Sequence, residues 1–149
     1  MSNPAAFYNR IYGGNSYATF FTESDHFAAP ELRRFVAEFH LGSGRCLEVG
    51  GGRGAFQDIV QDYTGTDLSE VVAGNYRKPF FTANAEALPF DDGLFDAVWT
   101  ITVLEHVTKP RKSAPRNSSG CEAEWAAVPK TRVELSSLDL RRNPGAALF

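Results

Sequence analysis

The sequence predicts an α/β protein built on a parallel sheet, of which it supplies the first four strands. Three observations lead to this fold class. Short apolar segments alternate with a segment of helical spacing, as in β-α-β units. A glycine-rich stretch, 50–54, follows directly on one of the strand candidates. Asp67 and Asn84 stand at the ends of the next two strand candidates. These features predict a Rossmann-like, doubly wound sheet with a ligand at the carboxyl edge of its strands.

Length and composition limit the possible classes. A chain of 149 residues has the size of one domain and can bury a substantial core. Hydrophobic residues make up 43% and charged residues 22%, which excludes collagen-like and wholly disordered chains. No apolar run reaches the roughly 18 residues of a membrane span, and the first ten residues lack a secretory pattern. Cys46 and Cys121 fit neither a disulfide scaffold nor a zinc site, so we expect a cytoplasmic protein without a metal centre.

The composition changes after Thr108. Before this point there are 7 basic and 14 acidic residues, and after it 8 basic and 4 acidic ones. Only Trp125 and Phe149 of the 19 aromatic residues lie in this last part. Such a composition predicts a poorly packed or disordered tail over 111–149. The basic residues of the tail are scattered among acids, which argues against a nucleic-acid arm.

The elements follow in order. Residues 1–29 form an aromatic-rich segment without a clean period, which we expect to pack on the rest of the protein without forming a long element. Over 30–39, apolar residues recur at i, i+3, i+4 and i+7, which predicts a helix that Gly42 can end. Strands are predicted over 45–49, 63–67, 80–82 and 95–102, and a second helix over 55–61. The partial domain therefore covers 30–110.

Three strand ends carry the candidate site. Glycines after the first strand permit a tight turn and a close backbone approach, and the helix start behind them attracts an anionic or electron-rich ligand. A carboxylate such as Asp67 at the end of the second strand can accept both hydrogen bonds of a ribose diol. Each feature also has a structural interpretation, since Gly50–Gly54 can be a tight turn and Asp67 and Asn84 can be helix caps. Their joint placement at neighbouring strand ends favours a site.

Three motifs resemble those of the class I S-adenosylmethionine-dependent methyltransferases of type 11. They are LEVGGGRG at 47–54, Asp67, and AEALPFDDG at 85–93 continued by FDAV at 95–98 and VLEHV at 103–107. The resemblance implies S-adenosylmethionine as the cofactor and a role for eight residues. By this resemblance, the methionine moiety is lined by Gly50, Gly52 and Gly54, and Glu48 orders their loop. Asp67 holds the ribose hydroxyls. Adenine is contacted by Asn84 and Ala85, and Thr100 lies under the cofactor. Many relatives carry Asp in place of Asn84, whose amide oxygen can still accept from the adenine amino group.

Two other interpretations stay open. Gly50-x-Gly52-x-x-Ala55 also satisfies the dinucleotide pattern of the NAD-dependent dehydrogenases. Glu48 before the glycines and the run ending at 104–107 favour the methyl donor. A non-enzymatic module that retains the pocket is the third possibility. No catalytic residue is assigned, because methyl transfer has no mandatory base, and His106 is a candidate base only if the acceptor must lose a proton.

The resemblance ends near Pro110. The family's sheet has seven strands in the order 3-2-1-4-5-7-6, and this sequence supplies four of them. We therefore expect the fourth strand to be an open apolar edge. Read one nucleotide later, the coding sequence from Arg111 on permits the missing helix, turn and strand, so we hypothesise that the tail is a frameshift product. Because the half of the family's domain that binds the acceptor is absent from this sequence, we expect weak or no turnover. The sequence determines neither the acceptor nor the oligomeric state.

Overall fold

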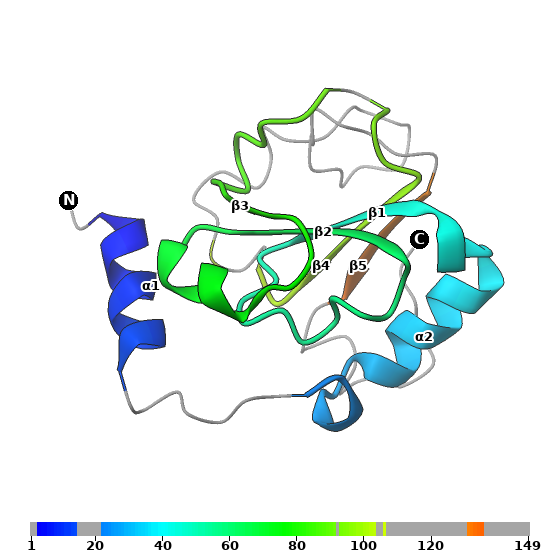
Figure 1. The fold of residues 1–149 in the computed structure, drawn as a ribbon, viewed down its shortest axis with the longest axis horizontal. Coiled ribbons are helices and arrows are strands. Elements are labelled where there is room, and N and C mark those ends of the chain that lie inside the picture. The colour runs from blue at the N-terminus through cyan, green and yellow to red at the C-terminus, as the bar shows by residue number, and fades with distance from the viewer. Residues whose placement is uncertain (1–2, 15–21, 92, 104–105, 107–130, 136–149) are drawn as a thin grey trace.

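The computed structural model describes residues 3–14, 22–91, 93–103, 106 and 131–135. Its centre is a parallel sheet in the order β3-β2-β1-β4-β5 (Figure 1). The strands are β1 (Arg45–Val49), β2 (Asp62–Asp67), β3 (Phe80–Thr82), β4 (Ala97–Ile101) and β5 (Thr131–Leu135). The described helices are α1 (Pro4–Gly13) and α2 (Ala29–Glu38), with short 3-10 turns η2 (Glu23–Asp25), η3 (Leu41–Ser43) and η4 (Glu70–Asn75). No described helix combines the length and the apolar character that a membrane crossing requires.

The four predicted strands are confirmed. β1 is central and pairs with β2 through Leu47↔Thr64 and with β4 through Leu47↔Val98. β1 and β2 are buried after their first residue and β4 is buried throughout, which is typical of parallel strands covered on both faces. Because every pairing is parallel, the carboxyl ends of these strands meet at one edge of the sheet.

A fifth strand corrects one expectation. β5 pairs in parallel with β4 over all five of its residues, from Ala97↔Thr131 to Ile101↔Leu135. The prediction that β4 is an open edge is therefore wrong, and part of the tail joins the sheet. Thr131, Val133 and Leu135 supply strand-forming residues within a stretch whose overall composition predicts disorder. The remaining tail, 111–130 and 136–149, lies outside the described residues.

Helix α2 covers one face of the sheet. Pro30 occupies its first turn, and Leu32 and Phe35 are buried against Cys46 and Trp99. The predicted helix over 30–39 is thus confirmed, although it ends earlier than Gly42. His40, with φ 54°, takes the left-handed conformation that follows the helix. The opposite face of the sheet packs Leu47, Val49, Phe95 and Val98 beneath the segment 85–90.

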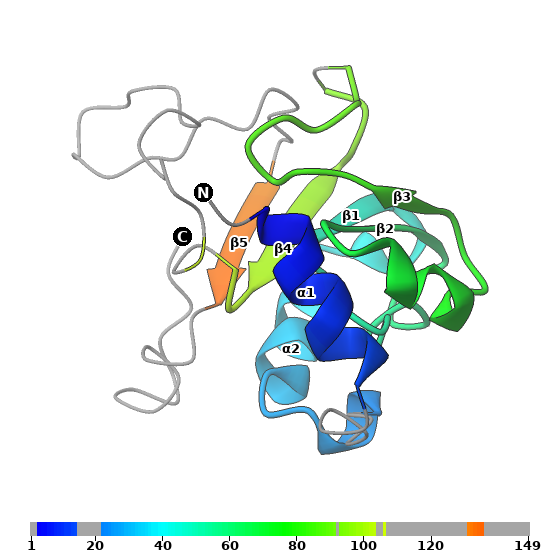
Figure 2. The same ribbon diagram turned by 90° about the vertical axis from the view of Figure 1, so that its left-hand side faces the viewer.

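Helix α1 lies at the carboxyl edge of the sheet (Figures 1 and 2). The sequence analysis did not predict it, because its apolar residues show no clean helical period. The sequence marks only the N-terminus of this helix. The Asn3 side chain caps it by accepting from the Ala5 N–H at 3.0 Å, and Pro4 follows in the first helical position. No residue of α1 is buried. Contacts with its neighbours, including a 2.7 Å hydrogen bond between Ser69 Oγ and Asn9 Oδ1, hold it in place.

The helix predicted over 55–61 is wrong. These residues form successive turns and bends, with hydrogen bonds from Gln57 N to Gly54 O and from Ile59 N to Phe56 O that span three residues. The buried Gln57 side chain explains the difference, because its Nε2 also donates to Gly54 O, at 3.1 Å, and so competes for a helical acceptor. The segment then ends directly at β2.

Candidate ligand site at the carboxyl edge of the sheet

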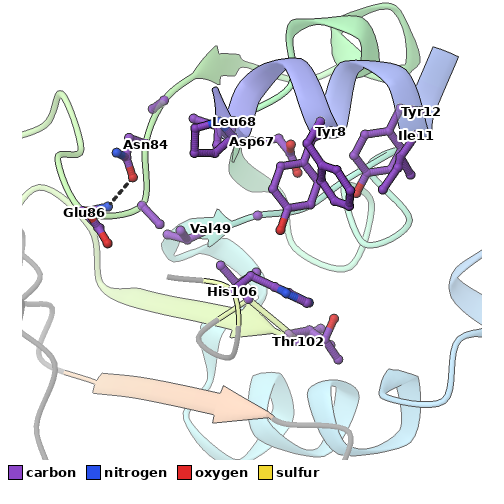
Figure 3. Close-up of a pocket in the computed structure, with 17 residues that line it drawn as sticks. Tyr8, Ile11, Tyr12, Val49, Asp67, Leu68, Asn84, Glu86, Thr102 and His106 are labelled. Atoms are coloured by element: carbon purple, nitrogen blue, oxygen red, sulfur yellow. Dashed lines mark hydrogen bonds between the residues drawn. The ribbon is translucent and has the colours of Figure 1, made fainter. Parts of the chain in front are cut away.

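A cavity of about 430 Å³ opens where four strands end. Its floor is formed by residues at or just after the ends of β1, β2, β3 and β4, namely Val49, Gly50, Asp67, Leu68, Ala83, Asn84, Ile101 and Thr102. Helix α1 forms the opposite wall with Tyr8, Ile11 and Tyr12 (Figure 3). This is the position at which parallel α/β sheets bind their ligands, outside the carboxyl ends of the strands and beside the point where the strand order reverses.

The glycine loop after β1 is held from the side of β2. The Gly52 N–H donates to Asp67 Oδ2 at 2.9 Å, and the Gly51 N–H donates to Thr66 O at 2.9 Å. Gly50, Gly52 and Gly54 have φ values of 71°, 51° and 75°, in the left-handed region that residues with a side chain rarely adopt. The chain therefore needs glycine at these three positions for its backbone path. Of the three, Gly50 lines the cavity, whereas Gly52 and Gly54 shape the loop behind it.

Asp67 connects the loop to the cavity. Its side chain is buried, lines the cavity and accepts from Gly52 N at one oxygen and from Ser69 N at the other, both at 2.9 Å. Burial raises its pKa, and the backbone N–H donors oppose this shift. The bond to Ser69 spans two residues and forms a turn before η4, whose N-cap is Ser69, so Asp67 is not the helix cap of the structural interpretation. A carboxylate offers about four acceptor sites, so these two bonds leave capacity for a ligand.

Glu48 lies beneath the loop and not in the cavity. Its side chain is buried and accepts a short hydrogen bond from the Tyr63 hydroxyl. A Cβ added to Gly51 would lie 3.0 Å from Glu48 Oε2, which places the carboxyl group directly against the loop. Burial raises the pKa of Glu48 to about 7, with the hydrogen bond from Tyr63 acting in the opposite direction. Glu48 is therefore placed to support the loop from below.

Asn84 and Ala85 lie at the end of β3 and line the cavity. Asn84 Oδ1 accepts from the Glu86 N–H at 2.9 Å, a turn-forming bond (Figure 3). The preceding residue, Ala83, donates its N–H to Asp67 O at 2.8 Å, which joins the ends of β2 and β3. Thr100 differs from these residues, because it is buried inside β4, donates to Val49 O at 3.1 Å and does not line the cavity.

Several residues at the site were missed by the sequence analysis. Tyr76, after η4, donates its hydroxyl to Gly52 O at 3.0 Å, and its ring lies against Gly54 and Gly65. On α1, the Tyr12 hydroxyl lies 3.1 Å from where a Cβ on Gly52 would be. Neither tyrosine belongs to a motif. For Tyr12 the sequence signal was the density of aromatic residues in 1–29, which does not identify what they contact, and for Tyr76 there was none.

The structure therefore brings the predicted strand ends together. Gly52 and Asp67 are hydrogen bonded, and Asp67 and Asn84 line the same cavity. Gly50, Asp67, Asn84 and Ala85 reach the cavity, whereas Glu48, Gly52, Gly54 and Thr100 lie behind it. His106, which follows β4, is exposed and also lines the cavity.

This fold and site define a parallel α/β domain of the Rossmann-like class with a ligand cavity at its switch point. Residues 47–116 match the family model described as a methyltransferase domain. The predicted resemblance to the S-adenosylmethionine-dependent methyltransferases is thereby confirmed over the part of the chain that carries the site.

Three known proteins are similar to this chain in sequence or fold. An uncharacterized protein of Methanocaldococcus jannaschii is 32% identical over 99 residues, which cover 64% of this chain and 47% of the relative. The CcbJ methyltransferase of Streptomyces caelestis superimposes with a TM-score of 0.53 at 16% identity, covering 69% of this chain and 47% of that one. The magnesium protoporphyrin IX methyltransferase of Synechocystis, solved with bound S-adenosylmethionine, gives 0.52 at 13% identity, covering 72% and 65%. At these identities the two structures support the fold alone. The chain spans about half the length of the curated relative that it matches.

Proposed function

We propose that the chain binds S-adenosylmethionine at the carboxyl edge of its sheet and serves the transfer of the methyl group to an acceptor. The observation that carries the proposal is the convergence of three strand ends. Gly52 and Asp67 are joined by a 2.9 Å hydrogen bond, and Asp67 shares its cavity with Asn84. The match of residues 47–116 to a methyltransferase domain supports the same conclusion.

The cavity suits this cofactor in size and chemistry. Its volume of about 430 Å³ lies within the roughly 300–1,000 Å³ of small-molecule sites. Asp67 retains acceptor capacity for the two hydroxyls of a ribose. Leu68 and Ala85 supply apolar surface for a purine, and the amide of Asn84 can hydrogen bond with its edge. Under this proposal the glycine loop, Glu48 and Thr100 shape the floor and do not contact the adenosyl group.

Charge distinguishes this cofactor from a dinucleotide. The lining residues that the structure describes include two carboxylates, Asp67 and Glu86, and neither lysine nor arginine. In addition, the glycine loop leads into turns over 52–58 and not into a helix. A pyrophosphate normally rests on a helix N-terminus after such a loop, and here that dipole is missing. Both features favour a sulfonium cation over the diphosphate of NAD, which remains the alternative.

The residues around the cavity can bind and orient a methyl donor and an acceptor, and methyl transfer requires little more from the protein. When bound, S-adenosylmethionine supplies a methyl group that is already activated for transfer. The cavity walls then hold the donor and the acceptor in line and exclude water. Asp67 fixes the ribose end, and α1 covers the opposite side.

Calorimetric titration tests the proposal. The full chain is titrated with S-adenosylhomocysteine and, separately, with NAD. We expect saturable heat with the first ligand only, and at least about tenfold weaker binding by Asp67→Asn, which loses the charge-assisted bonds to a ribose. Asp91→Asn, outside the cavity lining, is the matched control. Binding of NAD alone would favour the dehydrogenase interpretation, and binding of neither ligand by a folded chain would favour a non-enzymatic module.

A further inference from the structure

The cavity has two ends with different chemistry. At one end are the polar residues Asn84 and Glu86, after β3, and Asp67 of β2 lies between them and Tyr8 of α1 in the view of Figure 3. At the other end, α1 faces the segment that follows β4, and Tyr8 and Ile11 lie across the cavity from Thr102 and His106. The adenosyl group of the proposed cofactor requires Asn84 and Asp67. The space between α1 and the segment after β4 lies beyond these two residues and is the part left for another molecule.

The end beneath α1 is aromatic. The rings of Phe7 and Tyr8 meet edge to face at 5.3 Å, and the rings of Tyr8 and His106 do so at 6.4 Å. Ring systems arranged in this way offer faces and edges to a further flat ring. Ile11 and Val103 add aliphatic surface to the same end. An apolar ring system with one polar nitrogen nearby matches the usual composition of a small-molecule site.

The charges at this cavity disfavour an anion. Its described lining has the carboxylates of Asp67 and Glu86 but no lysine or arginine. Two arginines contact residues of the lining without belonging to it: Arg53 donates to Tyr12 O at 2.8 Å, and the guanidinium of Arg10 lies 5.9 Å from the Phe7 ring centroid. A phosphate or carboxylate on the acceptor would face these two carboxylates with no lysine or arginine beside it in the described lining.

Backbone strain connects this end to the glycine loop. Thr102 has φ 56°, an outlier for a β-branched residue, and strain of this kind concentrates at functional sites. The turn it forms places Val103 on Gly50, where an added Cβ would lie only 2.2 Å from Val103 Cγ2. His106 N then donates to Val103 O at 2.9 Å. The turn thus fixes His106 relative to the glycine loop at the floor of the cavity.

We propose that the end of the cavity beneath α1 is the acceptor subsite and that it selects a small uncharged phenol. The aromatic walls take the ring, the missing cations reject phosphorylated or carboxylated compounds, and the His106 imidazole accepts a hydrogen bond from the hydroxyl. This assignment rests on the proposed function, because only a bound donor at the polar end makes the remaining space an acceptor subsite.

Binding of three matched probes tests the subsite without relying on turnover. The full chain is saturated with S-adenosylhomocysteine, and the dissociation constants of 2-naphthol, 2-naphthyl phosphate and decahydro-2-naphthol are measured by calorimetry. We expect 2-naphthol to bind at least about tenfold more tightly than its phosphate and roughly threefold more tightly than the saturated alcohol. Failure of 2-naphthol to bind, a preference for the phosphate, or displacement of S-adenosylhomocysteine by 2-naphthol would each overturn the proposal.

Two lysine variants on α1 test whether 2-naphthol binds at the end of the cavity beneath this helix. Ile11→Lys places a cation in the cavity lining, and Ala6→Lys places the same charge on an exposed position of the same helix outside the lining. We expect I11K to reverse the ranking of 2-naphthol and its phosphate, and A6K to leave both constants within about twofold. Equal effects of the two variants would refute the location. If S-adenosylhomocysteine binds and 2-naphthol does not, only the acceptor-subsite proposal is refuted. If the folded chain does not bind S-adenosylhomocysteine, the proposed function is refuted as well.

Discussion

Three glycine-to-alanine substitutions separate backbone strain from steric contact at Gly50, which lines the cavity. Gly74 has ordinary backbone angles and open space around it, Gly93 has φ 73° and open space, and Gly50 has φ 71° and Val103 Cγ2 at 2.2 Å from an added Cβ. All three changes reduce the freedom of the unfolded chain equally, so Gly74→Ala measures this common term. Relative to it, left-handed backbone costs about 1–2 kcal/mol in Gly93→Ala.

Gly50→Ala carries that strain and the contact with Val103. Overpacking typically adds about 1–3 kcal/mol, so the free energy of unfolding should fall by about 2–5 kcal/mol relative to Gly74→Ala. Urea unfolding of the three variants, followed by circular dichroism, gives the differences. A Gly50→Ala variant no less stable than Gly93→Ala would show that Val103 does not rest on the glycine loop, and the link between the loop and the acceptor end would be lost.

Three further changes address the supports of the cavity. Tyr76→Phe removes the donor to Gly52 O and should lower the free energy of unfolding by about 1 kcal/mol while weakening S-adenosylhomocysteine binding, and unchanged affinity would contradict a role in shaping the loop. Burial raises the pKa of Glu48 from 4.5 to about 7, so between these pH values the folded state binds more protons than the unfolded state. The free energy of unfolding of the wild type should therefore fall by about 3 kcal/mol as the pH rises from 4.5 to 7. Unfolding curves of Glu48→Gln from pH 4 to 8 should lack this loss, and an identical pH profile in both proteins would exclude Glu48 as its source. Arg53→Met removes the 2.8 Å bond to Tyr12 O and should speed amide exchange and proteolysis in α1 but not in α2, which serves as the internal control.

The sheet could be predicted from the sequence because its signals are local. β1, β2 and β4 are short apolar runs bounded by glycine or polar residues, and parallel pairing then places Asp67 and Asn84 at one edge. The family match over 47–116 confirms the resemblance carried by the same motifs.

What could not be predicted depends on long-range contacts. Helix α1 has no buried residue and hence no regular apolar stripe, so its place over the cavity is decided by partners such as Ser69 that are distant in the sequence. The turns over 55–61 arise because Gln57 satisfies Gly54 O and Asn75 O, and no local pattern reveals the second partner. β5 was missed because its five residues, of which three are strand-forming, lie in a tail whose average composition indicates disorder.

The two walls of the cavity differ in how freely they can change. Residues of the floor end strands that are buried in the core, and a substitution there disturbs packing on both faces of the sheet. The ten residues of α1 include none that is buried, so side chains facing the cavity can be exchanged with little penalty to the fold. Under the proposed assignment, acceptor preference can change over evolutionary time through a single short helix while the strand ends that would hold the donor stay the same.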